Sequence, residues 1–320
     1  MVTGVGAIIG YGILRSLKKT GNDYFLIGTD IFDDAAGRAW ADNFIQAPLT
    51  SSAGYKDWLT KTVIDQHVEL LIPGIEQDLH FFSDNRDIFE KLDIKVALND
   101  KNLVDLSRDK WSMHEELKAI NSPLRIKSLY SGSYKEISKD IGVPFLLKPR
   151  KGYASKGIVR IKTESDFLPH EHMMGSNLIA QPIVGSDEEE YTVSLFGNGN
   201  TKFDAFISMR RKLSPDGSTQ KAWISQPNGI YEAAQTLCTH FKPVGPTNMQ
   251  FRKDGDTWKL LEINPRISSS TSIRTAFGYN ESQMCVDFYL GKEQIAQPSL
   301  KHGYATRYIE DIIFYDSDNI

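Results

Sequence analysis

The stretch Trp258-Lys-Leu-Leu-Glu-Ile-Asn-Pro-Arg266 combines an apolar strand pattern with oxygen ligands and a cation. On a strand, Glu262 and Asn264 project to one face, whereas Leu261 and Ile263 project to the other face, into the core. Two oxygen ligands therefore lie side by side. Mg²⁺ prefers such ligands and is usually bound by one or two carboxylates together with substrate phosphates. The stretch predicts a metal site on a strand.

The preceding segment, 248–252, has the pattern of a partner strand and contributes one more oxygen. We expect Gln250 to bind the metal or to orient the other ligands, and also to contact the nucleotide. The predicted metal ligands are thus Gln250, Glu262 and Asn264, with Mg²⁺ as the expected ion and Mn²⁺ as its substitute. Arg266 follows the proline that ends the strand, where its guanidinium is placed to stabilise phosphoryl oxygens during catalysis.

A glycine-containing basic loop follows another buried strand, in the sequence FLLKP-RKGYASKG at 145–157. Backbone amides of such a loop can fold over phosphates while Lys148 supplies a point charge. A solvated turn is an equally weighted alternative, and no Walker A sequence is present. The candidates here are Lys148, Gly152, Ser155 and Gly157 for nucleotide binding and Lys156 for catalysis.

The segment 178–185 ends a strand with groups suited to an adenine ring. Backbone groups of Gln181, Ile183 and Val184 would meet the edge of the ring, and apolar side chains would meet its face. An acidic run follows at 187–190. Such runs are usually solvated, but Glu190 enters the next strand, and we assign it to the ribose hydroxyls.

Four further residues are candidates for substrate binding. Arg211, within the run 210–212, and Arg274 would clamp a carboxylate or an acyl phosphate. The alternatives, of similar weight, are a solvated turn and a helix-surface charge. Glu76 and Asp78 follow a strand of the first domain, where they would receive an amine.

The order of strands and helices predicts two kinds of sheet. Up to about residue 99, short apolar runs alternate with helical patterns, which indicates βαβ units and a parallel sheet. One amphipathic helix is predicted at 105–119. Beyond it, closely spaced strands joined by turns such as 197–200 indicate antiparallel hairpins. The predicted domains are 1–105, 106–180 and 181–320.

The glycines of the first turn raise a rival function. Gly4, Gly6, Gly10 and Gly12 open a helix after a strand, and Asp30 ends the next strand, as in proteins that bind NAD(P). The spacing is not GxGxxG, and tight helix packing explains the glycines equally well. A nicotinamide-dependent oxidoreductase therefore stays open as an alternative.

Composition excludes several classes of protein. The chain has 320 residues, a formal charge of -4 and two cysteines, with no CxxC spacing. Such a charge provides no general attraction for nucleic acid or a membrane surface. We find no signal peptide and no apolar run of membrane-spanning length, so we expect a cytoplasmic protein. Cys238 and Cys285 are expected to be packed thiols.

Five motifs, taken in order, resemble those of the ATP-grasp enzymes, and among them the carbamoyl-phosphate-synthase large-subunit-like group. The matching segments are 148–157, 181–184, 190–191, 248–250 and 262–268. The resemblance implies a Rossmann-like pre-ATP-grasp domain followed by a two-lobed grasp with antiparallel sheets. It adds Lys110 as a phosphate contact and implies that Glu262 bridges two metal ions. Where those enzymes carry a second arginine, this chain has serines at 268–270, which argues against bicarbonate as the substrate.

The function implied by this resemblance is an ATP-dependent carboxylate-amine ligase. A carboxylate would attack the γ-phosphate to give an acyl phosphate and ADP, and an amine or similar nucleophile would displace phosphate. The partners are then small molecules, and a homodimer is the commonest assembly of soluble proteins. A protein that binds ATP without turnover is the remaining alternative.

Overall fold

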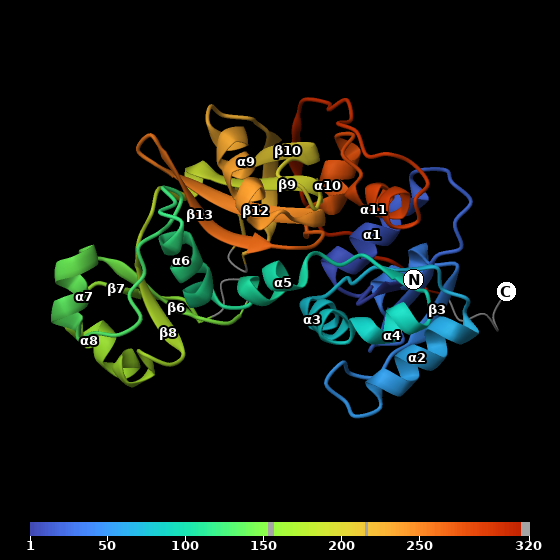
Figure 1. Cartoon of the computed structure of the whole chain (residues 1–320), viewed down its shortest axis with the longest axis horizontal. Helices are drawn as coiled ribbons and strands as arrows, with labels where there is room; N and C mark the ends of the chain where they lie inside the picture. Colours follow the sequence, from blue (N-terminus) through green and yellow to red (C-terminus); the bar gives the residue numbers. More distant parts are fainter. Residues whose placement is uncertain (153–156, 215–216, 315–320) are drawn as a thin grey trace. The chain divides into compact units, whose positions relative to one another are not determined.

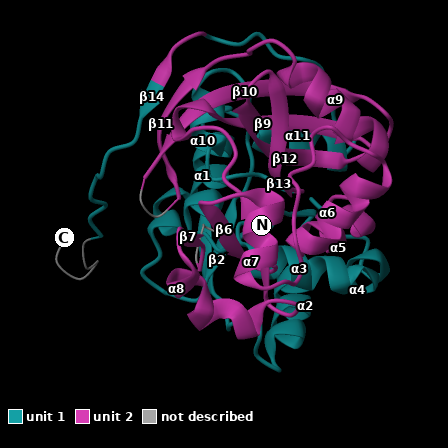
Figure 2. Ribbon diagram, turned by 90° about the vertical axis from the view of Figure 1, so that its left-hand side faces the viewer, with its two compact units in different colours: residues 1–98, 266–301, 305–320 teal, residues 99–265, 302–304 magenta. Residues whose placement is uncertain are grey.

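The computed structural model describes residues 1–152, 157–214 and 217–314, and the chain divides into two compact units. Unit 1 comprises 1–98, 266–301 and 305–320, and unit 2 comprises 99–265 and 302–304 (Figure 2). Residues 266–301, which the sequence placed in the third domain, thus group with the N-terminal part.

Contacts with the first helix explain this grouping. Thr275 Oγ1 lies 2.9 Å from Ser16 Oγ, and Asn280 Nδ2 donates to the carbonyl oxygen of Ser16 at 3.0 Å. Such long-range contacts cannot be read from sequence order.

Unit 1 is built from short strands and helices (Figure 1). In chain order they are β1 (Val2–Thr3), α1 (Ile8–Lys18), β2 (Ile27–Asp30), the 3₁₀ helix η1 (Ala36–Trp40), β3 (Asn43–Gln46), α2 (Tyr55–Asp65), β4 (Leu70–Leu71), α3 (Glu76–Asp84), α4 (Arg86–Lys91), β5 (Lys95–Val96), α10 (Thr271–Ala276) and α11 (Glu281–Tyr289). Strands β1, β2 and β3 pair in parallel, as do β4 and β5. These pairings match the βαβ alternation of this part of the sequence.

Unit 2 contains two antiparallel sheets. Its elements are α5 (Lys101–Ser107), α6 (Lys110–Ala119), α7 (Tyr134–Ile141), β6 (Phe145–Pro149), β7 (Val159–Ile161), α8 (Glu164–Phe167), η2 (Leu168–Met173), β8 (Leu178–Pro182), η3 (Asp187–Glu189), β9 (Glu190–Asn198), β10 (Phe203–Leu213), β11 (Thr219–Ile224), α9 (Ile230–Phe241), β12 (Val244–Asp254) and β13 (Thr257–Asn264). The smaller sheet has the order β7-β6-β8, and the larger has the order β13-β12-β9-β10-β11. Tyr304 begins β14 (Tyr304–Thr306), which lies next to β11 at the edge of the larger sheet.

The stretch predicted to be helical at 105–119 is helical at 105–107 and at 110–119, but it belongs to two helices, α5 and α6, and not to one. The break falls at Asp109, whose carboxylate accepts a hydrogen bond from the Trp111 amide at 2.9 Å. An aspartate in this position caps a helix N-terminus, so it starts a new helix instead of continuing the old one.

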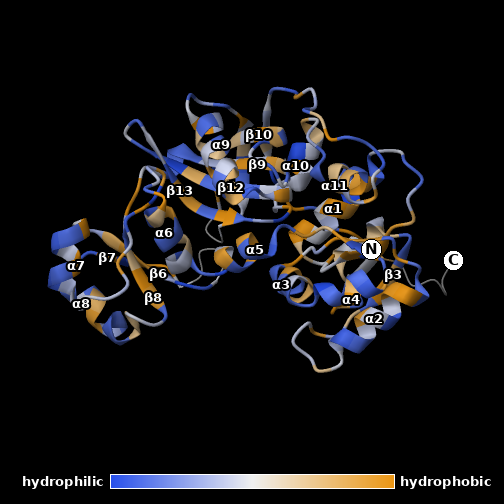
Figure 3. Ribbon diagram, in the orientation of Figure 1, coloured by the Kyte–Doolittle hydropathy of each residue, from blue (hydrophilic) through white to orange (hydrophobic). Residues whose placement is uncertain are grey.

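The larger sheet has an apolar face and a polar face. Odd-numbered residues of β9 and β12, such as Val193 and Met249, are fully buried in a cluster with Ala234 and Leu237 of α9. In Figure 3 the strands of this sheet carry both hydrophilic and hydrophobic colours, in keeping with this alternation. The alternating residues of β9 and β12 therefore project to the opposite face, where the polar candidates lie.

A β-bulge corrects one prediction about the stretch 258–266. Glu262 pairs with Gln250 but Leu260 pairs with Phe251, so Leu261 has no opposite residue. The extra residue shifts the alternation. Leu260, and not Leu261, therefore lies in the core, while Leu261 lines a pocket.

Within the described part of the chain, the helices are all too short or too polar to cross a bilayer.

Candidate nucleotide and metal site

The predicted metal ligands lie together on the polar face of β12 and β13. Gln250 is opposite Glu262, and Asn248 is opposite Asn264. Glu262 Oε1 accepts hydrogen bonds from Gln250 Nε2 at 2.5 Å and from Asn264 Nδ2 at 2.9 Å. On the other side of β12, Thr192 Oγ1 donates to Asn248 Oδ1 at 2.6 Å. Hydrogen bonds thus join the predicted ligands across β12 and β13, and Asn248 beside them is bonded to β9.

This set has the chemistry that a magnesium ion needs. A carboxylate and two amides offer hard oxygen donors, and Mg²⁺ keeps the rest of its shell for water and phosphate. The side-chain amide nitrogens of Gln250 and Asn264 face Glu262, so both amide groups would have to rotate to present their oxygens to a metal ion. Among the described residues, no three His, Cys, Asp or Glu side chains gather as a metal cage. The residues therefore fit an ion that arrives with phosphates.

Lys148 lies on β6 and is half-buried. Burial lowers its pKa to about 8, while the nearby charge of Glu262 acts in the opposite direction. The positive charge of Lys110 lowers the pKa further. A desolvated ammonium next to a second cation binds a phosphate strongly, because the anion restores its lost interactions.

The start of α6 is tied to the end of β6. Lys110 Nζ donates to the Gly152 carbonyl at 3.0 Å, and the Lys110 amide donates to the Arg150 carbonyl at 2.9 Å. Arg150 also forms an ion pair with Asp109 and donates to the Tyr130 hydroxyl at 3.0 Å. The two predicted phosphate lysines, 110 and 148, are thereby held in one region.

Two other residues of the predicted loop, Ser155 and Lys156, lie outside the described residues. Gly157 has φ +74°, and a Cβ there would approach Pro149 at 3.0 Å. A left-handed backbone of this kind favours glycine. Gly157 therefore has a conformational role besides its predicted contact with the nucleotide.

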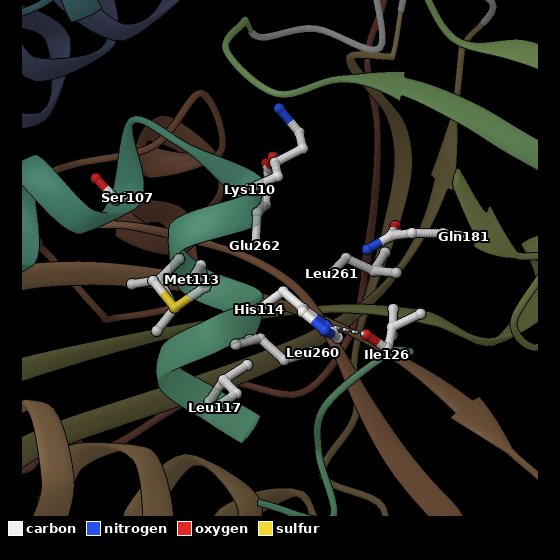
Figure 4. Close-up of a pocket in the computed structure, with 11 residues that line it drawn as sticks. Ser107, Lys110, Met113, His114, Leu117, Ile126, Gln181, Leu260, Leu261 and Glu262 are labelled. Carbon is white, nitrogen blue, oxygen red and sulfur yellow. Dashed lines mark hydrogen bonds between the residues drawn. The ribbon is translucent and has the colours of Figure 1, made fainter. Parts of the chain in front are cut away.

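A pocket with about 430 Å³ of empty space, part of it open to solvent, lies beside α6, β8 and β13 (Figure 4). It is lined by Lys110, Gln181, Leu261 and Glu262, among others. His114 also lines it and its Nδ1 lies 3.0 Å from the Ile126 carbonyl oxygen (Figure 4). Gln181, predicted to contact the adenine base, and Lys110, predicted to contact the phosphates, thus border the same cavity.

Gln181 enters this cavity in a fixed orientation, because its Nε2 donates to Ser128 Oγ at 2.7 Å. Ile183 and Val184, predicted with it, are half-buried and buried, and neither is among the residues that line the pocket. His114, by contrast, was missed. Its place four residues after Lys110 on one helix face was the available signal.

The structure gives Glu190 and Arg211 partners other than the predicted ones. Glu190 is 2% exposed, and its Oε1 accepts from Arg211 at 2.7 Å. Its Oε2 accepts from Arg252 at 2.9 and 3.2 Å. Both carboxylate oxygens are therefore engaged, which disagrees with a ribose ligand. Arg211 is 6% exposed, which disagrees with a substrate clamp.

Arg274 is neither an exposed clamp nor a helix-surface charge. It is fully buried in unit 1, where it forms an ion pair with Glu281 at 3.1 Å and donates to Ser268 Oγ at 2.8 Å. Its carboxylate partner is part of the same unit, so the substrate-binding prediction is wrong. Burial of this kind marks a structural role.

The other candidates of unit 1 form two groups. Arg266 forms an ion pair with Glu76 at 2.7 Å, and Glu76 lies 3.7 Å from His80. Asp78 is buried, and it accepts from the Tyr55 hydroxyl at 2.9 Å. Burial raises the pKa of Asp78, so this carboxyl group is a poor candidate for receiving an amine.

The first turn of the chain favours the packing interpretation of its glycines. Asp30 accepts hydrogen bonds from the amides of Gly6 at 2.7 Å and Phe32 at 3.1 Å. A Cβ at Gly10 would lie 2.3 Å from the Gly4 carbonyl oxygen. The carboxylate that a dinucleotide ribose would need is thus already bound to the backbone of its own unit.

Comparisons with known proteins agree with this architecture. Residues 177–312 match the family "ATP-grasp in the biosynthetic pathway with Ter operon", and residues 2–97 match "PylC-like, N-terminal domain". The fold is similar to N5-carboxyaminoimidazole synthetase from Staphylococcus aureus complexed with ADP, with a TM-score of 0.73 and 19% identity over 93% of this chain and 79% of that chain. It is also similar to a biotin carboxylase from Campylobacter jejuni, with a TM-score of 0.72 and 16% identity over 95% and 73% of the two chains.

The family matches, the curated relatives and the structural neighbours together support an ATP-grasp protein with a single grasp unit. Its sequence is 23% identical to the carbamoyl phosphate synthase large chain of Thermoplasma volcanium and 22% identical to that of Methanosarcina mazei, over 91% and 87% of this chain. It spans 30% and 27% of the length of these relatives. The predicted resemblance to the ATP-grasp enzymes and to this group among them is thereby confirmed.

Proposed function

We propose that this protein is an ATP-dependent ligase that activates a carboxylate as an acyl phosphate and passes it to an amine. The cluster of Glu262 with Gln250 and Asn264, near the half-buried Lys148, carries this proposal. It combines oxygen donors for a magnesium ion with a cation for phosphate. The ADP complex of the structurally similar Staphylococcus aureus enzyme supports an adenine nucleotide as the ligand.

In this proposal the residues of unit 2 bind and orient the nucleotide. Gln181 would meet the base, and Lys148 and Lys110 would hold the phosphates by charge. Glu262, Gln250 and Asn264 would hold Mg²⁺, which neutralises charge on the phosphates when bound. Phosphoryl transfer asks a protein mainly for alignment and charge neutralisation, and these residues supply both.

The chemistry would proceed in two steps. A substrate carboxylate oxygen attacks the γ-phosphorus, and the bond from that phosphorus to the β–γ bridging oxygen breaks, releasing ADP. The amine nitrogen then attacks the acyl carbon, the C–O bond to phosphate breaks, and the nitrogen loses a proton. Arg266 is our candidate for the group that contacts the transferred phosphoryl. Arg211 and Arg274 are not proposed as substrate contacts.

The test is Mg²⁺-dependent release of ADP and phosphate from ATP, with pooled carboxylates and pooled amines supplied together and separately. We expect release to need both pools and Mn²⁺ to replace Mg²⁺. Glu262→Gln should lower turnover on the order of 100-fold, because the carboxylate of the ligand set is lost. Glu164→Gln, at an exposed position of α8, is the matched control and should behave as wild type.

Each alternative function predicts a different result in the same experiments. Tight binding of ATP with no turnover under any pool would replace the ligase by a non-catalytic ATP-binding protein. Binding of NAD(P)H without binding of ATP would revive the oxidoreductase, against the engagement of Asp30 by two backbone amides.

A further inference from the structure

Arg252 lies on the polar face of β12, on the same side of the strand as Gln250. Residues two apart on a strand share a face and lie about 7 Å from each other. The β12 pairing also places Arg252 directly opposite Glu190 of β9. A guanidinium in this position is within side-chain reach of phosphates bound at Gln250 and Glu262.

Contacts on two sides fix the orientation of this guanidinium. Its Nε and one amino nitrogen donate to Glu190 Oε2 at 3.2 and 2.9 Å, and the same amino nitrogen lies 2.7 Å from Asp187 Oδ1. The Arg252 side chain keeps 19% of its surface exposed, whereas that of Glu190 keeps 3%. A buried carboxylate that holds an arginine in one orientation lowers the entropy lost when that arginine binds a ligand.

The buried charges around this arginine are uneven. Arg211 takes the other oxygen of Glu190, so two guanidiniums share one buried carboxylate. The second carboxylate of the group, Asp187, has a side chain that is 91% exposed, and solvent screens an ion pair of that kind. The negative charge that balances the second guanidinium thus lies at the surface.

The neighbouring groups leave a surplus of positive charge. The charges of Arg252 and Lys110 lower the pKa of Lys148, and those of Glu262 and Glu190 raise it, so all of these groups are close enough to interact. Together with Arg211 and Asp187 they amount to four cations and three carboxylates. A surplus of positive charge in a partly buried site favours the binding of an anion.

We propose that Arg252 is a further phosphate-binding residue of the nucleotide site, held in place by Glu190. This inference rests on the proposed function, and it corrects the prediction that Glu190 itself binds the ligand. A guanidinium donates to phosphate oxygens in a fixed fork, and the charge surplus selects a phosphate over an uncharged ribose. The ligand is a nucleoside diphosphate or triphosphate.

The test compares the affinities for ADP and for adenosine, with adenosine measured by its competition with ADP. Arg252→Gln should weaken ADP binding about tenfold, the value of one charge-assisted hydrogen bond, and leave adenosine within about twofold. Its ADP affinity should also depend less on salt concentration. Arg252→Lys should recover part of the ADP affinity, because it keeps the charge without the fork.

Lys253→Gln is the matched control. It removes one positive charge from the next position of β12, on the opposite face of the sheet, and should leave both affinities as in wild type. If Arg252→Gln does not fold, the comparison rests on Arg252→Lys, which should lose ADP affinity selectively. The melting temperature of each variant separates misfolding from lost contact.

Two results would overturn the assignment. If Arg252→Gln binds ADP as the wild type does, Arg252 does not contact the phosphates. If the variant loses affinity for ADP and adenosine equally, the role of Arg252 is structural. Failure of the wild-type protein to bind ADP is a separate outcome. It would reject the proposed function together with this inference, whereas the first two results would leave the proposed function standing.

Discussion

Replacement of Glu281 by glutamine should destabilise unit 1, because it removes the charge that neutralises a fully buried arginine. Arg274 and Glu281 have side-chain exposures of 0% each and are joined at 3.1 Å. Removal of one partner of a buried ion pair leaves an uncompensated charge and costs about 3–5 kcal/mol. Since whole domains are stable by only about 5–15 kcal/mol, the loss should be a large fraction of the unfolding free energy.

The assay is thermal and urea unfolding at neutral pH. The exposed pair Lys61–Asp65, with side-chain exposures of 76% and 53%, provides the control. Asp65→Asn should leave the unfolding free energy nearly unchanged, because solvent screens that pair. The double variant Arg274→Met with Glu281→Leu should recover much of the loss, since it replaces the pair by apolar side chains of similar size.

A stable Glu281→Gln variant would refute this reasoning. If the variant unfolds as the wild type does but has a raised KM for the carboxylate substrate, then Arg274 contacts substrate, as its sequence position first indicated. An unchanged ADP affinity in the variant is also expected, because the proposed nucleotide contacts belong to unit 2.

Three other changes test individual features. Burial raises the pKa of Asp78 above its unfolded-state value near 3.8. Ionisation of Asp78 therefore lowers the stability as the pH rises from that value through the folded-state pKa. Asp78→Asn should raise the melting temperature at pH 7, and this gain should shrink toward acid pH. Gly185→Ala should lower the melting temperature more than Gly255→Ala. The two glycines have nearly the same φ, +58° and +59°, but a Cβ at Gly185 would lie 2.3 Å from the Lys253 carbonyl oxygen, whereas at Gly255 it meets open space. The pKa of Lys148 is about 8, so ADP affinity should fall above that pH as the ammonium loses its proton, and Lys148→Arg should bind with little pH dependence; a flat wild-type profile would contradict the lysine-phosphate contact.

Local pattern was sufficient to predict the most informative pair in the chain. Alternation along 258–264 put Glu262 and Asn264 on one face, and the structure has them hydrogen-bonded to each other. The same pattern was wrong for Leu261, because a bulge needs a partner strand before it exists. A sequence shows which residues alternate but not where an opposite strand is one residue shorter.

Charged residues were harder to interpret than the strand pattern. Arg211 and Arg274 were expected to meet ligands, and both are buried with carboxylates of the protein, Glu190 and Glu281. Arg252 was not singled out at all. The sequence next to an arginine does not show whether its carboxylate partner is a substrate or a residue distant in the chain. Only the tertiary structure distinguishes the two cases.

The sequence by itself determined the kinds of sheet, the ATP-grasp motifs and the identity of the oxygen donors, because each depends on residues a few positions apart. Tertiary structure alone decided the grouping of 266–301 with the N-terminal unit and the pairing of Glu190 with two arginines. These features join segments separated by tens or hundreds of residues. Their energies come from burial and charge neutralisation, which no local pattern contains.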